Sequence, residues 1–188
     1  MLQLSDSLEN VPVLSLQTGT KLAHTIGIII DPDTLAIPAL YVEGPGIDIQ
    51  PSVVFVEDIR EVSDIGYIID SSDSIMPLDG LVRLQKMIDA DVSLLDSIVV
   101  DQSGEKIGKI EDFSYDSDLF VIQQILVRPP LLKRVLGDGR IIHRSHIVEV
   151  TKEKVIIDNS SAMHTLREKT DESAAFVNPF LAPDTESR

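Results

Sequence analysis

The chain has 188 residues, 43% of them hydrophobic, and a formal net charge of −15 at pH 7. An acidic surface repels phosphate backbones, which argues against non-specific nucleic-acid binding by the whole chain. The sequence contains no cysteine, which excludes disulfides, thiolate nucleophiles and cysteine-based metal sites. No signal peptide is visible at the N-terminus, and no apolar stretch approaches the length of a bilayer span, so we expect a soluble cytoplasmic protein without a transmembrane segment.

The chain contains an internal repeat, and the repeat predicts two like structural units. Eight residues recur at an offset of 85: Gln17, Gly19, Lys21, Asp31, Asp33, Ile37, Val42 and Pro45 return as Gln102, Gly104, Lys106, Asp116, Asp118, Ile122, Val127 and Pro130. Six more recur at an offset of 88: Ile59, Glu61, Val62, Ile68, Ile69 and Asp70 return as Ile147, Glu149, Val150, Ile156, Ile157 and Asp158. The three extra residues enter the second copy within the stretch 131–139.

The predicted elements of each copy are mostly strands, because the apolar residues are chiefly Ile, Val and Leu and aromatic residues make up only 4%. A short strand opens each copy, at 13–15 and at 98–100. A turn with a glycine follows, Gly19 in the first copy and Gly104 in the second, where a residue free to adopt positive φ relieves strain. The next strand-like segments are 21–30 and 106–115.

An Asp-x-Asp turn and a long apolar run come next, and each copy closes with a strand, a polar turn and a strand. In the run 119–127, apolar residues occur at both odd and even positions, so they would lie on both faces of a strand. This pattern predicts a strand that is covered on both faces. Pro38 interrupts the same run of the first copy, and proline cannot donate to a β-ladder. Its position is therefore predicted to be an edge or a bulge.

Between the copies, Leu81, Leu84, Met87 and Ile88 have helical spacing, and Asp79 is a candidate N-cap. The fold class predicted is mainly β, with two tandem small β-barrels joined by a short helical linker. The boundaries predicted are a first domain at 8–76, the linker at 77–91, a second domain at 92–160 and a flexible tail at 161–188. The tail is rich in charge, Ser and Thr and lacks the β period.

The order of elements in the second copy resembles the PRC-barrel family. The resemblance rests on Val99-Val100-Asp101, on Gly104-Glu105-Lys106-Ile107-Gly108, and on the closing Ile147-Val148-Glu149-Val150. The first copy departs from the pattern, since Ala23 stands where Gly108 does. The family includes the cytoplasmic part of the reaction-centre H subunit and the C-terminal domain of a ribosome maturation factor. The resemblance implies small β-barrels that act as docking or assembly modules, with no catalytic residues to transfer.

Four groups of residues in the sequence are candidates for a chemical site. The Asp-x-Asp turns at 31–33 and 116–118 lack the spacing of a calcium loop, so we interpret them as turns. His143 and His146, three apart on an expected strand, should point to opposite faces and have no third metal ligand. No nucleophile turn of the Gly-x-Ser-x-Gly type is present, and the segment 137–139 is too short for a phosphate loop. The sequence therefore predicts no catalytic residue, metal or cofactor.

The one basic segment of the chain, residues 128–144, lies in the second copy, and apolar residues lie between its basic ones. It is either a solvated face or a docking site for a partner. The matching part of the first copy, 43–58, contains four acidic residues and no Lys or Arg. The candidate partner-binding residues are Arg128, Leu131, Leu132, Lys133, Arg134, Leu136, Arg140 and Arg144.

These features predict a non-enzymatic protein-binding adaptor or assembly module built from two barrels. Its partner would be a protein, and self-association stays open. One alternative is an RNA-processing or ribosome-assembly factor that uses the basic segment 128–144, since nucleic acid is disfavoured only for the acidic first domain. A further alternative is a membrane-peripheral assembly factor for a photosynthetic or cell-division complex.

Overall fold

A computed structural model describes residues 1–130, 139–158 and the backbone of 164–165. The chain is mainly β, with two sheets and one α-helix among these residues, α1 (Val82–Ala90). Short 3-10 helices are η1 (Ser5–Leu8), η2 (Val56–Asp58), η3 (Ser72–Ser74) and η5 (Arg144–His146). The strands are β1 (Leu2–Leu4), β2 (Pro12–Ser15), β3 (Lys21–Ile29), β4 (Ala39–Glu43), β5 (Ser52–Phe55), β6 (Ile59–Ser63), β7 (Gly66–Ile69), β8 (Ile75–Pro77), β9 (Ile98–Asp101), β10 (Lys106–Asp116), β11 (Val121–Arg128), β12 (Arg140–His143), β13 (Ile147–Val150), β14 (Lys154–Ile157) and β15 (His164–Thr165).

The two sheets have the same strand order, so the internal repeat of the sequence is also a repeat of structure. The first sheet runs β6-β7-β2-β3-β4-β5-β8 and the second β13-β14-β9-β10-β11-β12-β15. The parallel pair β2–β7 has its counterpart in the parallel pair β9–β14. The pairing of β5 with β8, in which Ser52 lies opposite Pro77, recurs 88 residues later as Arg140 opposite Thr165. Strand β15 lies beyond residue 160, where the sequence places the end of the second domain.

Neither sheet is closed, because the strands at its two ends do not pair with each other. The first sheet nevertheless curls enough to enclose a small core of its own. Five of its strands each contribute one side chain to that core: Val13, Ala23, Val42, Val54 and Ile69. Alternation along each strand brings these residues to one face of the sheet.

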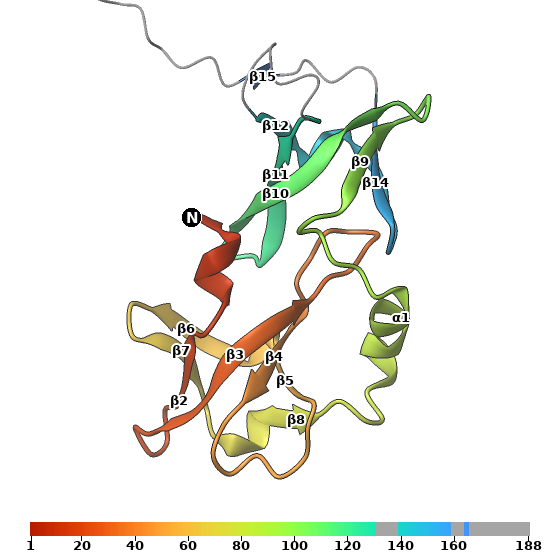
Figure 1. Ribbon diagram of the computed structural model, residues 1–188. Helices are drawn as coiled ribbons and strands as arrows, with labels where there is room; N and C mark the ends of the chain where they lie inside the picture. Colours follow the sequence, from red (N-terminus) through yellow and green to blue (C-terminus); the bar gives the residue numbers. More distant parts are fainter. Residues whose placement is uncertain (131–138, 159–163, 166–188) are drawn as a thin grey trace, which may run out of the picture.

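The main hydrophobic core belongs to both repeats. Leu8, Leu35, Ile37 and Leu40 from the first half pack in one buried cluster with residues of the second half that include Ile122. Ile37 is 1% exposed and Ile122 is fully buried. The long apolar runs of both copies are therefore covered on one side by the other repeat, which explains why these runs show no polar face. Figure 1 shows the two sheets one above the other.

At the centre of this shared core, the two repeats are joined by a reciprocal pair of backbone hydrogen bonds. The Ile37 amide donates to the Phe120 carbonyl over 2.8 Å, and the Ile122 amide donates to the Leu35 carbonyl over 2.9 Å. Each donor and each acceptor is 85 residues from its counterpart, and Ala36 and Val121 form the antiparallel bridge between them. The repeats are thus related by an approximate two-fold axis through this bridge, as the subunits of an isologous dimer would be.

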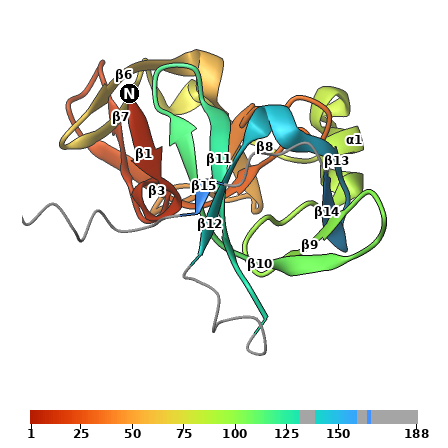
Figure 2. The ribbon, with the colours of Figure 1, turned by 90° about the horizontal axis from the view of Figure 1, so that it is seen from above.

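Helix α1 joins the repeats and also covers the outer face of the first sheet. Its Leu84 is buried against Ile29, Ala39, Val53 and Phe55. The helix lies on the opposite side of the molecule from the β6–β7 hairpin in both views (Figure 1 and Figure 2). The prediction of a helix here is confirmed.

The predicted N-cap of α1 is wrong. Leu81, not Asp79, occupies the N-cap position, and no side chain caps the helix there. The helix consequently depends on its apolar contacts with the sheet rather than on a cap.

The apolar run of the second copy contains a β-bulge that the sequence did not reveal. Tyr115 pairs with Ile122 and Ser114 pairs with Gln124, so Gln123 is left out of the ladder. Pro38, the residue equivalent to Gln123, precedes β4 and is likewise outside the ladder. The predicted edge or bulge is not found at the proline: Pro38 precedes β4, which lies between β3 and β5, and the register shift of the β3–β4 pair lies between Thr25 and Gly27. A position before the strand needs no amide donor for the ladder, so the proline is accommodated there.

In each repeat two neighbouring strands, β3 and β4 or β10 and β11, approach so closely that one of them needs a glycine at the contact. The glycine lies on β10 in the second repeat but just after β4 in the first. In the second repeat a Cβ on Gly108 would lie 2.2 Å from the Arg128 carbonyl oxygen. In the first repeat Ala23 stands in place of Gly108, and a Cβ on Gly44, across the strand pair, would lie 2.7 Å from the Ala23 Cα. The departure of the first copy from the repeat pattern is therefore compensated by the neighbouring strand.

We expect the shared core to make the two repeats unfold together. Ile37→Ala and Ile122→Ala should each reduce the free energy of unfolding by about 3 kcal/mol, the usual cost of truncating a buried isoleucine. Chemical denaturation followed by circular dichroism should show a single transition for both variants. The exposed Ile65→Ala should change stability by less than about 0.5 kcal/mol. A variant that unfolds one repeat and leaves the other folded would contradict the shared core.

The glycine at the strand crossing gives a second prediction. Gly108→Ala should destabilise the protein by about 2 kcal/mol, because the new methyl group overlaps a backbone carbonyl that cannot move without displacing β11. Gly27→Ala is the matched control, since its Cβ would meet nothing closer than the Tyr41 side chain at 3.5 Å. Thermal denaturation of the two variants measures the difference. Equal stabilities would show that the crossing tolerates a side chain.

Candidate functional site

The described part of the basic segment belongs to the hairpin of β11 and β12. Val127 pairs with Arg140 at the end next to the connection, and this connection is longer by three residues than that between β4 and β5. The Arg128 guanidinium forms an ion pair with Glu111 on the neighbouring strand β10. Both side chains are partly exposed, so this pair contributes little to stability. It does reduce the charge that Arg128 offers to a partner.

Arg144 serves a contact between the repeats. Its guanidinium donates to the Thr34 carbonyl oxygen in the first repeat over 2.8 Å. Arg140 is partly buried on β12. The structure therefore separates these two candidate residues: Arg144 lies at the junction of the repeats, and Arg140 lies at the start of a sheet strand. The remaining candidates, Leu131, Leu132, Lys133, Arg134 and Leu136, lie outside the described residues.

The acidic residues of the first repeat pair locally. Glu43 lies 3.2 Å from the His24 ring, and Glu57 accepts from Arg83 of α1 over 3.1 Å. Within the described ranges, no ion pair links the acidic part of the first repeat to Arg128, Arg140 or Arg144. The opposite charges of the two copies therefore do not form direct ion pairs with each other among these described residues.

The N-terminal segment fastens the two repeats together, which the sequence analysis did not predict. Strand β1 pairs with β10 of the second repeat, and Gln3 lies opposite Tyr115. The Tyr115 hydroxyl lies 3.1 Å from both the Gln3 Oε1 and the Ser7 Oγ. Burial raises the pKa of the nearby Tyr67, from the first repeat, above its usual range. The only hint in the sequence was the apolar alternation of Leu2 and Leu4.

The Asp-x-Asp clusters are turns, as predicted. The Asp31 carboxylate accepts from the Asp33 amide over 3.0 Å, and the Asp116 carboxylate accepts from the Asp118 amide over 2.9 Å. These backbone donors lower the pKa of Asp116. The N-terminal ammonium group lies 3.2 Å from Asp118, a contact that raises its pKa. Among the described residues, no group of three or more His, Asp or Glu side chains is arranged to hold a metal ion.

The two histidines are not placed on one strand, so that expectation is wrong. His143 ends β12, whereas His146 ends the 3-10 helix η5 that follows. The His143 Nδ1 lies 2.9 Å from the Ser145 hydroxyl, and the His146 ring lies 3.2 Å from Asp158. Each ring therefore has its own local polar partner, and they do not converge on a common site.

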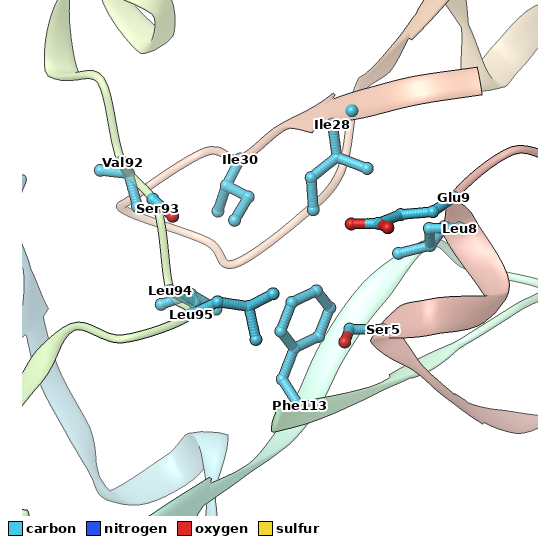
Figure 3. Close-up of a pocket in the computed structure, with 11 residues that line it drawn as sticks. Ser5, Leu8, Glu9, Ile28, Ile30, Val92, Ser93, Leu94, Leu95 and Phe113 are labelled. Carbon is cyan, nitrogen blue, oxygen red and sulfur yellow. The ribbon is translucent and has the colours of Figure 1, made fainter. Parts of the chain in front are cut away.

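A cavity of 210 Å³ lies between the repeats, close to the approximate two-fold axis. Figure 3 shows Ile28 and Phe113, which are 85 residues apart, facing each other across it. Leu8 and Leu94, both 1% exposed, contribute further apolar wall from the two segments that precede the repeats. The Glu9 carboxylate is directed into the space between the walls (Figure 3). No sequence pattern marks this site, because its walls come from segments far apart in the chain.

A comparison with models of known protein families and with curated proteins finds no match for this chain. Of the helices in the described ranges, none is long and apolar enough to cross a membrane.

The aspartate turns predict how stability depends on acidity. The folded pKa of Asp116 is lower than its value of about 3.8 in the unfolded chain. The unfolded chain therefore binds more protons, and the stability that this group contributes is lost as the pH falls below about 4. Asp116→Asn should flatten the acid side of a stability–pH curve measured by urea denaturation. Asp48→Asn changes an exposed carboxylate outside these turns and should leave the slope unchanged. An unchanged slope for the first variant would refute the linkage.

Proposed function

We propose that the protein is a non-enzymatic adaptor or assembly module that binds a protein partner through the basic segment of its second repeat. The supporting observation is the asymmetry of two otherwise like hairpins. The β11–β12 hairpin has the longer connection and carries the basic residues, whereas the β4–β5 hairpin has a shorter connection whose only charged residue is Asp48. Figure 1 shows the end of β11 and the start of β12 on the side of the second sheet away from the first. A partner that contacts the exposed Arg128 there would approach without disturbing the shared core.

The resemblance to PRC-barrels supports the same proposal. The shared order of strands and glycine turn, with the closing Ile-Val-Glu-Val of the second copy, fits a pair of PRC-barrel-like repeats that act as docking modules. The first sheet curls around a row of inward side chains of its own, although neither sheet is closed. A scaffold of this kind provides rigid strands and leaves recognition to its loops.

The charge of the segment favours an acidic protein partner. Complementary charges accelerate association and set its orientation, and the interleaved leucines supply the apolar anchors that hold a complex together. RNA is the second candidate, because the same cations can contact phosphates. Its signature is a log affinity that falls steeply and linearly with log salt concentration. A membrane-peripheral role predicts co-flotation with anionic vesicles.

The proposal predicts that charge reversal in the segment abolishes partner binding. Lys133, Arg134 and Arg140 replaced together by glutamate should lose the partners that the wild-type protein recovers by affinity purification from its native host. The fold should persist, since the long connection carries two of the three changes. Circular dichroism and thermal denaturation measure that persistence.

The matched control carries the same change in charge on the same repeat. Lys106, Lys109 and Lys154 are exposed residues of β10 and β14, and their replacement by glutamate should leave partner recovery intact. If both triple variants recover the same partners as the wild type, the basic segment is a solvated face and the proposal is wrong. If both lose them, net charge rather than the segment governs binding.

A further inference from the structure

We propose that the cavity between the repeats is a binding site for a small organic amine, a ligand with an apolar body of about six carbons and an ammonium group. This inference is independent of the proposed adaptor function. Its basis is the combination of a partly open cavity with apolar walls and a single carboxylate among the side chains that line it.

The size of the cavity suits such a ligand. At 210 Å³ it exceeds the roughly 150 Å³ of an apolar cavity that takes up benzene. It is smaller than the pockets of about 300 Å³ or more that hold drug-sized molecules. Ile28, Leu94 and Phe113 provide its apolar wall, against which a chain of methylene groups would lose its contact with water.

The polar end of the cavity selects the charge of the ligand. Glu9 is exposed, and Figure 3 shows its carboxylate turned toward the space between Ile28 and Phe113. The nearest serine, Ser5, already donates its hydroxyl to Asp112 over 2.6 Å. The Glu9 amide donates to the Asp6 carbonyl, but within the described part of the chain its carboxylate has no hydrogen bond or ion pair. An ammonium group in the cavity would supply the Glu9 carboxylate with a cationic partner.

The surrounding charge acts in the same direction. Residues 1–80 contain 13 acidic and two basic side chains, so the first repeat attracts cations and repels fatty acids and other anions. In the segments before the repeats the offset is 86, since the Asn10 and Asp96 amides donate to the equivalent carbonyls of Thr25 and Ile110. Leu95 therefore stands, on the other side of the approximate axis, where Glu9 stands in the first half, and both residues line the cavity. The site therefore has one charged side and one apolar side, which orients a ligand with one charged end.

The experiment is a titration of the full chain, labelled at its Ile and Leu methyl groups, with n-hexylammonium, n-hexanol and hexanoate. We expect n-hexylammonium to shift the methyl resonances of Ile28, Leu94 and Leu95, with a dissociation constant at least tenfold lower than those of the neutral and anionic analogues. Equal affinity for hexanoate, or shifts confined to residues elsewhere, would overturn the proposal.

Two variants separate the role of the charge from that of the apolar walls. Glu9→Gln should weaken n-hexylammonium binding about tenfold and leave n-hexanol binding unchanged. Glu61→Gln, a change of an exposed carboxylate on β6, should leave both unchanged. Leu95→Trp should fill the cavity and abolish the binding of both ligands. Unaltered n-hexylammonium binding in the Glu9 or Leu95 variant would show that the amine binds elsewhere.

Discussion

The structure depends on the apolar contact between the two repeats and on the pair of backbone hydrogen bonds at its centre. Ile37 and Ile122 each direct an amide to the opposite repeat within a core that excludes water. Two open, curled sheets of this size would expose much of their apolar surface if they stood alone. Each repeat instead contributes to a core that both share, which is why we expect the pair to fold together.

The segments before each repeat reinforce this arrangement. Strand β1 extends the sheet of the second repeat, and α1 covers the outer face of the first. Leu8 and Leu94 reach the shared core from equivalent positions in these segments. The connections therefore contribute to packing as well as to continuity of the chain, and truncation of either would remove part of the core.

Much of the secondary structure could be predicted because local chemistry determines it. Gly104 takes positive φ in its turn, and Asp116 accepts backbone amides in its own. The place of Pro38 outside the ladder follows from its missing donor. The relation between the repeats could not be predicted, because an apolar run such as 119–127 shows only that both its faces are covered, not by what.

The candidate site was less predictable than the fold for a similar reason. Arg144 contacts a backbone carbonyl of the other repeat, and carbonyls leave no mark in a sequence pattern. The Glu9 carboxylate lies at the cavity because of tertiary packing alone. Charge counts located the basic segment. They could not distinguish a basic side chain that joins the two repeats, such as Arg144, from one that is open to binding a partner.

The covalent connection of the two repeats has a consequence for the groups near the axis. In a homodimer of single repeats, symmetry would place the same residue on both sides of the axis, either two carboxylates or two leucines at the cavity. A single chain is free of that constraint, so Tyr115 can stand opposite its counterpart Ile30 and Glu9 opposite Leu95. In a symmetric dimer an asymmetric ligand would bind equally well in two orientations, whereas the single chain makes those two orientations unequal in energy.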